Sequence, residues 1–246
     1  MLSLFNKKRF LRDLVPPGYT DIHSHLLPGI DDGAKSFDDT FKLIVGLQDM
    51  GFSQFVTTPH IIQHVWENTR PSIEEVHADT QVKLKANSFG LPFRAAAEYM
   101  MDGDFLNHLA EGNMLTLGAN YILVEMSYLN PPIQLYDVIF EIQLAGYIPV
   151  LAHPERYSYY HRNFEEFGKL RNAGCKFQLN LLSTVGYYGK GVTECAARLL
   201  KSGFIDFTGS DVHHKAHLAA FRTRLHISGG VDQLTTAMKN NKIFAV

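Results

Sequence analysis

Short apolar segments alternate with amphipathic segments along almost the whole chain. Seven apolar segments have the length and composition of strands, at residues 19–23, 54–57, 93–98, 121–125, 148–152, 176–180 and 205–208. Amphipathic stretches with helical periodicity lie at residues 37–50, 71–89, 104–111, 133–145, 163–173, 191–202 and 230–240. This regular alternation predicts an α/β fold with parallel strands, and seven such units are typical of a parallel barrel.

Residues at the predicted helix ends support these boundaries. Ser36 precedes a helix and is followed by Asp39 in the first turn, while Pro71 stands at the start of the next helix. A glycine follows four of the predicted helices just before the next strand, at Gly51, Gly146, Gly174 and Gly203. The repeated join of helix, glycine and strand indicates repeated βα units.

The chain has 246 residues, which is enough for one barrel-sized domain. No linker rich in Pro, Gly or Ser divides it, so we expect one domain over residues 19–246, preceded by an N-terminal extension over residues 1–18. The extension is basic and apolar, but it lacks the continuous apolar run of a signal peptide or a membrane span. We expect it to pack on the domain or to fray rather than to lie on a membrane.

Charge and cysteine content narrow the class of protein. There are 23 basic and 25 acidic residues, and this balance gives no electrostatic sign of a nucleic-acid partner. Two cysteines, Cys175 and Cys195, cannot form a disulfide framework, and they favour a reducing compartment. We therefore expect a cytoplasmic protein with no transmembrane segment.

Metal-type ligands gather at the ends of the predicted strands. The groups are Asp21-Ile-His-Ser-His25, Thr58-Pro-His60, Glu98, Glu125, His153-Pro-Glu-Arg156 and Ser210-Asp-Val-His213. Residues two apart in a strand point to the same side, so His23 and His25 can hold one ion together. Imidazoles with carboxylates suit manganese, iron or zinc. Because the carboxyl ends of barrel strands carry the active site, the pattern predicts a multinuclear metal site and a hydrolase.

The same motifs resemble the PHP (polymerase and histidinol phosphatase) family, and within it the metal-dependent tyrosine-protein phosphatases of bacterial capsule and exopolysaccharide systems. The resemblance is carried by Asp21-Ile-His-Ser-His-Leu-Leu-Pro-Gly-Ile-Asp-Asp-Gly33, Thr57-Thr-Pro-His60, Ala97-Glu98, Leu151-Ala-His-Pro-Glu-Arg156 and Gly209-Ser-Asp-Val-His213. It spans residues 19–213 in the family's order, and Asp-Asp-Gly in the first motif indicates the phosphatase branch. The implied fold is a single-domain distorted (β/α)7 TIM-like barrel, the PHP fold.

Carried over residue by residue, the resemblance implies a centre of three ions. The implied ligands are His23, His25, Glu98 and Asp211 for the first ion, Glu98, Glu125 and His153 for the second, and Asp32, His60 and His213 for the third. The resemblance favours Mn²⁺, while the ligand types leave iron and zinc open. Asp21, Asp31 and Glu155 are expected to support ligands or the fold rather than to bind metal.

Arg156 is expected to contact the substrate, because a planar guanidinium can donate two parallel hydrogen bonds to phosphate oxygens. The resemblance makes Arg156, Asp211 and His213 the expected catalytic residues. Related phosphatases carry a further arginine after the last motif, where this chain has His213-His-Lys-Ala-His217. The candidates for that role are Lys215, His217 and Arg222.

Four tyrosines follow two of the ligand strands and are candidates for an aromatic wall or for loop packing: Tyr128, Tyr157, Tyr159 and Tyr160. A cysteine-nucleophile phosphatase is excluded, because neither cysteine has an arginine six residues later; those positions are Leu181 and Lys201. The segment Gly186-Tyr-Tyr-Gly-Lys-Gly191 lacks the spacing of a phosphate-binding loop and is interpreted as a glycine-rich connection.

The expected activity is hydrolysis of a phosphate monoester by a metal-activated hydroxide. The resemblance makes the substrate phosphotyrosine on a protein, the partner a tyrosine autokinase of polysaccharide export, and the role regulation of capsular or exopolysaccharide synthesis. The alternatives are a small-molecule phosphoesterase, such as a histidinol-phosphate phosphatase-like enzyme, and a nuclease. An alternative from another class is a catalytically silent, metal-stabilised regulator that binds a kinase tail.

Overall fold

The computed structural model describes residues 9–245, and within that range nine strands form two sheets in which all neighbouring strands run parallel. The first sheet has the order β1-β2-β4, with β1 Tyr19–Asp21, β2 Phe52–Thr57 and β4 Phe93–Ala95. The second has the order β3-β5-β6-β7-β8-β9, with β3 His60–Ile61, β5 Glu98–Met100, β6 Tyr121–Glu125, β7 Ile148–Ala152, β8 Lys176–Asn180 and β9 Phe207–Gly209.

The two sheets meet at a pair of strand breaks. Thr58 and Pro59 separate β2 from β3, and Ala96 and Ala97 separate β4 from β5. The breaks lie side by side, because the Ala96 amide donates to the Thr57 carbonyl (2.8 Å) and the Glu98 amide donates to the Pro59 carbonyl (3.0 Å). Proline has no amide hydrogen for a sheet ladder, which accounts for the interruption on the first side. The segment 93–98, predicted as one strand, therefore divides between the two sheets.

The segments that follow β1 and β9 also meet. The His25 amide donates to the Val212 carbonyl (3.0 Å), and the Asp211 amide donates to the His23 carbonyl (2.7 Å). The Asp21 carboxylate accepts hydrogen bonds from the Ser210 amide (2.9 Å) and the Ser210 hydroxyl (2.6 Å), 189 positions later in the chain. The first and last strands are thus joined by backbone and side-chain hydrogen bonds.

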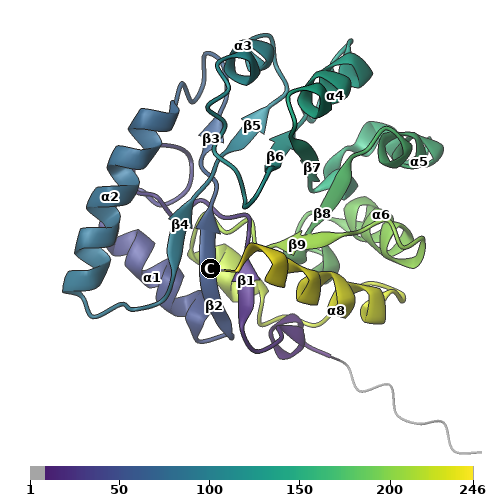
Figure 1. Ribbon diagram of the computed structural model, residues 1–246. Coiled ribbons are helices and arrows are strands. Elements are labelled where there is room, and N and C mark those ends of the chain that lie inside the picture. The colour runs from purple at the N-terminus through teal and green to yellow at the C-terminus, as the bar shows by residue number, and fades with distance from the viewer. Residues whose placement is uncertain (1–8, 246) are drawn as a thin grey trace, which may run out of the picture.

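The α-helices lie around the outside of the strands (Figure 1). Those in the described part of the chain are α1 Phe37–Gln48, α2 Arg70–Ala86, α3 Phe105–Ala110, α4 Leu135–Leu144, α5 Glu165–Asn172, α6 Lys190–Lys201, α7 Lys215–Ala220 and α8 Val231–Asn240. Short 3₁₀ turns cover Leu11–Leu14, Pro154–Arg156, Ser158–Tyr160, Leu181–Val185 and Asn241–Phe244. Only α7 has no counterpart among the predicted helices, because six residues are too few for a clear helical period.

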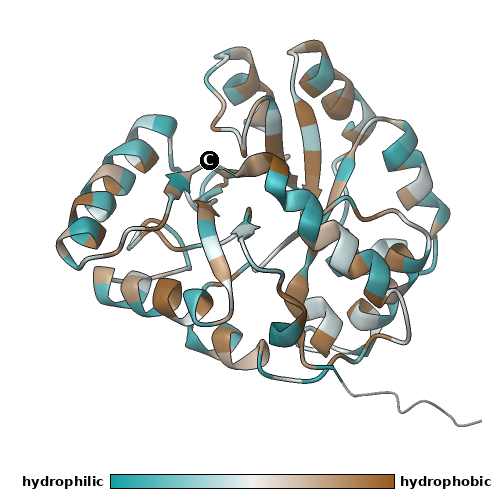
Figure 2. Cartoon of the chain, turned by 60° about the horizontal axis from the view of Figure 1, so that its bottom comes forward, coloured by the Kyte–Doolittle hydropathy of each residue, from teal (hydrophilic) through white to brown (hydrophobic). Residues whose placement is uncertain are grey.

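Hydrophobic side chains form an inner and an outer core. The inner cluster takes Val56 from β2, Leu123 from β6, Val150 from β7 and Phe207 from β9, so strands of both sheets enclose it. The larger outer cluster packs strands against helices. Figure 2 shows the matching pattern on the helices, which carry hydrophobic and hydrophilic residues together. Packing in both clusters therefore supports the strand ends.

The described part of the N-terminal extension packs on the segment that follows α7. Leu11 is fully buried, and its amide donates to the Thr223 carbonyl (3.2 Å), while the Arg12 amide donates to the Phe221 carbonyl (3.1 Å). The basic, apolar start of the extension at residues 1–8 lies outside the described residues. Within residues 9–245, no helix combines the length and the apolar character needed to cross a membrane.

Candidate metal centre

The strand ends bring the predicted ligand residues together. His23 and His25 follow β1, Glu125 ends β6, and His153 follows β7. The two strand breaks place His60 and Glu98 at the same end, because each is the first residue of a strand that resumes there. Asp211 and His213 follow β9, and Asp32 comes from the loop before α1. Asp32 is the most exposed of these side chains, at 55%, whereas His60 and His213 are only 13% and 14% exposed.

Glu98 lies at the middle of the cluster. Its Oε2 is 3.1 Å from His23 Nε2 and 3.2 Å from His60 Nδ1, and its Oε1 is 3.0 Å from His153 Nε2. Within residues 9–245, four groups have ligand atoms that all lie within 4.8 Å of one another: His23, His25 and Asp211; His23, Glu98 and His153; His60, Glu98 and Glu125; and His25, Asp32, His60 and His213. All nine predicted ligand residues belong to these overlapping groups.

Glu125 lies closer to His60 than the resemblance implied. Its Oε1 is 3.0 Å from His60 Nδ1, whereas its Oε2 is 3.9 Å from His153 Nε2. Glu125 therefore stands between the position expected for the second ion and the position expected for the third.

The buried polar atoms of the centre fit a bound cation. His60 Nδ1, Glu98 Oε2 and Glu125 Oε1 are buried without a hydrogen-bond partner. A buried polar atom left unpaired costs roughly 1–3 kcal/mol, so three of them within bonding distance of a common point need a shared partner. A divalent cation supplies that partner, and a set of imidazoles and carboxylates suits manganese, iron or zinc. The residues present therefore fit a metal centre.

Neighbouring side chains fix the orientation of the ligand imidazoles. Gln178 donates from Nε2 to the Leu179 carbonyl (2.7 Å), which leaves its Oε1 to accept from His23 Nδ1 (2.7 Å). Asp31 Oδ2 likewise accepts from His25 Nδ1 (2.8 Å). With Nδ1 donating in both residues, the two Nε2 atoms face the other ligand candidates and lie 3.4 Å apart. An imidazole held through Nδ1 can present Nε2 to a metal ion, which replaces any proton on that nitrogen.

Glu98 and Asp211 remain ionised in the buried centre. Burial alone would raise the pKa values of Glu98 and Asp211, but the nearby imidazoles, His23 foremost, hold both well below their ordinary values. Burial would lower the pKa of His23, but the charges of Glu98 and Asp211 raise it to about 9. The ionised carboxylates favour cation binding, and a bound cation would replace the proton on the imidazole of His23.

The two carboxylate oxygens of Asp211 have separate roles. Oδ1 lies 3.3 Å from His23 Nε2 and 3.5 Å from His25 Nε2, within the ligand cluster. Oδ2 accepts hydrogen bonds from Arg156 Nη1 (2.9 Å) and Asn180 Nδ2 (2.6 Å). The backbone of Asp211 is left-handed (φ 50°), a conformation that non-glycine residues rarely adopt. Asp211 is thus turned so that one oxygen faces the ligands and the other faces the protein.

Arg156 lies between two aromatic rings. The centre of its guanidinium is 4.6 Å from the Tyr128 ring centroid and 4.3 Å from the Tyr188 ring centroid, within the range of cation–π contacts. Tyr188 OH also accepts from Asn180 Nδ2 (3.0 Å). Because Nη1 donates to Asp211, the guanidinium has a fixed plane, and its remaining N–H groups can face a substrate.

The aromatic residues around the centre differ from the expected set. Tyr128 lines the cavity, but Tyr157 and Tyr160 are buried, and Tyr159 donates its hydroxyl to the Ser127 carbonyl. These three tyrosines pack within their loop instead of forming a wall. Tyr188 lines the cavity in their place, and it comes from the glycine-rich connection between β8 and α6.

A cavity of about 500 Å³ opens over the centre, a size suited to a small organic group. His60, Glu98, Asp211 and other ligand candidates line one side of it, and Trp66 and Tyr128 line another. Of the three candidates for a second phosphate contact, His217 lines this cavity, whereas Lys215 and Arg222 do not.

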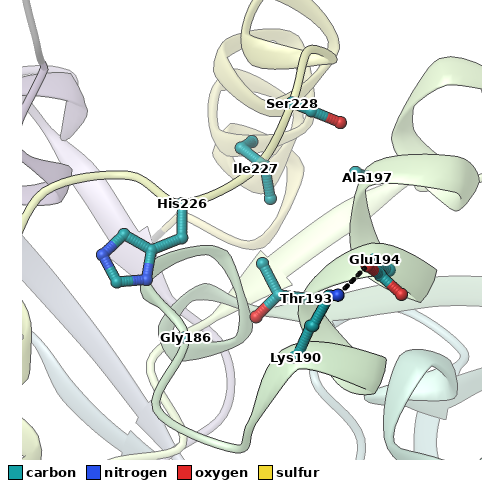
Figure 3. A pocket seen from close by; sticks show the side chains of 8 residues that line it. All are labelled: Gly186, Lys190, Thr193, Glu194, Ala197, His226, Ile227 and Ser228. Atoms are coloured by element: carbon teal, nitrogen blue, oxygen red, sulfur yellow. Dashed lines mark ion pairs between the residues drawn. The ribbon is translucent and has the colours of Figure 1, made fainter.

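A different cavity of about 320 Å³ lies between α6 and the segment before α8 (Figure 3). It is lined by Gly186, Lys190, Thr193, Glu194, Ala197, His226, Ile227 and Ser228. Its Lys190 and Glu194 form an ion pair (3.6 Å), and none of the nine ligand candidates lines it. Of these two cavities, only the larger one over the ligand cluster is lined by candidate metal ligands.

Comparison with protein families gives one match that spans most of the chain. The sequence model of the family described as "Capsular polysaccharide synthesis, CpsB/CapC" matches residues 19–223. The chain is 30% identical over 195 residues to the tyrosine-protein phosphatase YwqE of Bacillus subtilis, covering 79% of this chain and 77% of the relative. It is 26% identical over 232 residues to the putative tyrosine-protein phosphatase CapC of Staphylococcus aureus, covering 91% and 89%.

Solved structures show the same likeness. A chain from the crystal structures of YwqE from Bacillus subtilis and CpsB from Streptococcus pneumoniae, described as unique metal-dependent tyrosine phosphatases, superposes with a TM-score of 0.81. The identity is 26%, and the match covers 92% of this chain and 93% of that one. The histidinol phosphate phosphatase of Lactococcus lactis gives a TM-score of 0.54 at 14% identity, covering 92% and 94%, which shows a shared fold.

Proposed function

The chain belongs to the capsular polysaccharide synthesis family CpsB/CapC, and we propose that it hydrolyses phosphotyrosine in a protein as a metal-dependent tyrosine-protein phosphatase. The observation that carries this proposal is the cluster of nine imidazole and carboxylate ligands beside the guanidinium of Arg156, beneath a cavity of about 500 Å³. The relatives named as tyrosine-protein phosphatases, one of them with a superposable metal-dependent structure, support the same assignment.

The two sheets are proposed to form one closed, distorted (β/α)7 barrel of the PHP type. The paired breaks between β2 and β3 and between β4 and β5 divide two of the seven barrel strands without separating them. Hydrogen bonds between the segments after β1 and β9 support closure at the other side. The inner core, which strands of both sheets enclose, is the packing expected of a filled barrel.

Three Mn²⁺ ions are proposed to occupy the centre, with iron or zinc as alternatives. Asp32, His60 and His213 would hold one ion, and the remaining ligand candidates would hold two more around Glu98. Bound divalent ions supply positive charge and lower the pKa of coordinated water, which provides a nucleophile near neutral pH. The chain contributes ligands of fixed orientation, because Gln178 and Asp31 hold the two imidazoles after β1.

Arg156 is proposed to bind and orient the phosphoryl group. Its Nη1 remains on Asp211, while its other N–H groups donate to phosphoryl oxygens, on which charge accumulates as the ester breaks. Tyr128 and Tyr188 keep the guanidinium plane in place. A tyrosine leaving group has a pKa of about 10, so its departure depends less on a general acid than that of an alkyl alcohol does.

The biological setting of the proposal follows the family. The substrate protein would be a tyrosine autokinase of polysaccharide export, and its dephosphorylation would regulate capsular or exopolysaccharide synthesis. A cytoplasmic location is part of the same proposal. Both cysteines are free and buried, which suits a reducing compartment.

The decisive experiment measures phosphate release by chelator-stripped protein from a phosphotyrosine peptide and from histidinol phosphate, with and without added Mn²⁺. Release that requires metal and favours the peptide is the expected result. His23→Ala and Asp211→Ala should each abolish it while the circular-dichroism spectrum stays that of wild type. Preference for histidinol phosphate would replace the proposal with a small-molecule phosphoesterase, and single-stranded DNA in the same assay tests for a nuclease. Release from none of these would favour a silent regulator.

A further inference from the structure

A second cavity adjoins the one over the metal centre. It measures about 400 Å³ and lies between the loop before α1, the helix α1 and the start of α7. Asp32, His213 and His214 line both cavities, so these side chains form a shared rim. A substrate whose phosphoryl group lies on the metal centre can therefore extend over this rim into the second cavity.

The second cavity combines apolar surface with two lysines. Ala34, Leu43 and Ala216 supply the apolar part of the lining. Lys35 Nζ donates to the Asp31 carbonyl (2.9 Å) and lies 5.9 Å from the ring centroid of Trp66, which lines the first cavity. Lys35 therefore stands at the boundary between the two cavities.

Lys215 is the first residue of α7 and is exposed. Within residues 9–245 it forms no ion pair with an acidic side chain. An exposed cation that lines a cavity and has no acidic partner among the described residues is available to an anion from outside.

The acidic side chains in the lining have partners already. Asp32 Oδ1 lies 3.4 Å from His213 Nε2, toward the metal centre. Asp39 accepts from the Ser36 hydroxyl (2.9 Å) at the start of α1. The hydroxyl partner leaves the charge of Asp39 in place, so with Asp32 turned to the metal centre the lining has two lysines, Lys35 and Lys215, against one carboxylate.

We propose that the second cavity is a substrate subsite for residues that flank the phosphotyrosine, and that Lys35 and Lys215 select acidic side chains there. The inference rests on the proposed phosphatase function and concerns its specificity. Neighbouring residues of an extended peptide lie about 3.3 Å apart, so residues next to the phosphotyrosine pass directly over the rim that the two cavities share. A small aryl phosphate occupies the first cavity alone and does not reach the lysines.

The test compares kcat/KM for three substrates: a phosphotyrosine peptide with glutamate on both flanks, the same peptide with lysine on both flanks, and 4-nitrophenyl phosphate. Wild-type protein should favour the acidic peptide, and the preference should fall at high salt because exposed charges are screened. Lys215→Glu should reduce the ratio of acidic to basic peptide by about two- to tenfold, the range expected when one exposed ion pair is replaced by a repulsion.

Lys190→Glu is the matched control, because Lys190 is also the exposed first residue of a helix but lies at the other cavity. It should leave the peptide ratio unchanged. Lys35→Met tests the second lysine. It should reduce kcat/KM for the acidic peptide relative to that for the basic peptide and relative to that for 4-nitrophenyl phosphate.

Two results would overturn the inference while leaving the phosphatase assignment intact. One is equal turnover of both peptides by wild-type protein. The other is a loss in Lys215→Glu that is the same for both peptides and for 4-nitrophenyl phosphate, which would assign Lys215 to the phosphoryl group itself. Absence of phosphate release from all three substrates would instead refute the phosphatase function.

Discussion

Replacing Arg156 by lysine keeps the positive charge but removes the planar guanidinium group and its parallel N–H donors. A lysine ammonium at this position can bind Asp211 Oδ2 or a phosphoryl oxygen, but it cannot reproduce the two directions in which the guanidinium donates. The variant should lose one charge-assisted hydrogen bond, worth about 1.5–3 kcal/mol. Since 1.4 kcal/mol corresponds to a tenfold change, we expect kcat/KM for a phosphotyrosine peptide to fall about 10- to 100-fold.

Arg156→Ala should cost more, because it removes every donor to the phosphoryl group. Loss of such a donor typically lowers turnover by about 10²- to 10³-fold. The alanine variant also leaves Asp211 Oδ2 with Asn180 as its remaining partner, so a change in metal binding can mimic a catalytic defect. The assay therefore measures kcat and KM at saturating Mn²⁺ and, on the same samples, the number of ions bound per chain.

Tyr188→Phe is the matched control for these two variants. It keeps the ring over the guanidinium but removes the hydroxyl that accepts from Asn180, and kcat/KM should change by less than about threefold. The reasoning is refuted if Arg156→Lys, with its full complement of metal, retains more than half of the wild-type kcat/KM. In that case the guanidinium does not contact the phosphoryl group in the transition state.

Three further predictions follow from the surroundings of the centre. Gln178→Leu removes the acceptor that fixes His23 and should weaken Mn²⁺ binding by about 10- to 100-fold, which metal titration measures. A thiol-blocking reagent should leave phosphatase activity intact, because burial raises the pKa values of Cys175 and Cys195 to about 12; parallel loss of activity and free thiols would contradict this. Burial raises the pKa of Glu155 from 4.5 in the unfolded chain to about 7, so folding takes up a proton between these pH values. The contribution of Glu155 to the free energy of unfolding therefore falls as the pH rises from 4.5 to 7. In urea unfolding of metal-stripped protein, the free energy of unfolding of Glu155→Gln should therefore rise by about 3 kcal/mol relative to that of wild type as the pH goes from 4.5 to 7. A difference between the two proteins that does not change with pH would disprove the raised pKa.

Some elements were predictable from the sequence because their signals are local. The strands β6, β7 and β8 begin and end where the pattern predicts, since each is a short apolar run bounded by turn residues. The break at Ala96 and Ala97 was not predictable, because both residues are buried and apolar like their neighbours. The interruption there is set by the adjacent strand, whose Thr58 and Pro59 lie beside it.

The same distinction applies to the metal centre. Its ligand candidates stand out because histidines and carboxylates that recur at the ends of apolar strands are unusual without a metal to bind. Gln178 and Asn180 share one face of β8, and both were missed. Two polar residues at the end of an apolar strand could have indicated that this strand end contributes to the site. A side-chain amide, however, neither titrates nor acts as a common metal ligand, so the residue type alone did not predict a role. Their roles depend on His23 and Asp211, which the fold brings from both ends of the chain.

The join between β1 and β9 also determines when the centre can form during synthesis. Asp21 and Ser210 are 189 positions apart, and their hydrogen bonds lie beside the segments that carry His23 and Asp211. His23 and His25 are synthesised long before Asp211, which completes their group of ligand candidates. A nascent chain therefore cannot complete the group of His23, His25 and Asp211 before residue 211 is synthesised, whereas His60, Glu98 and Glu125 all come from earlier positions. Ions bound to that group would then stabilise the contact between the segments that follow β1 and β9.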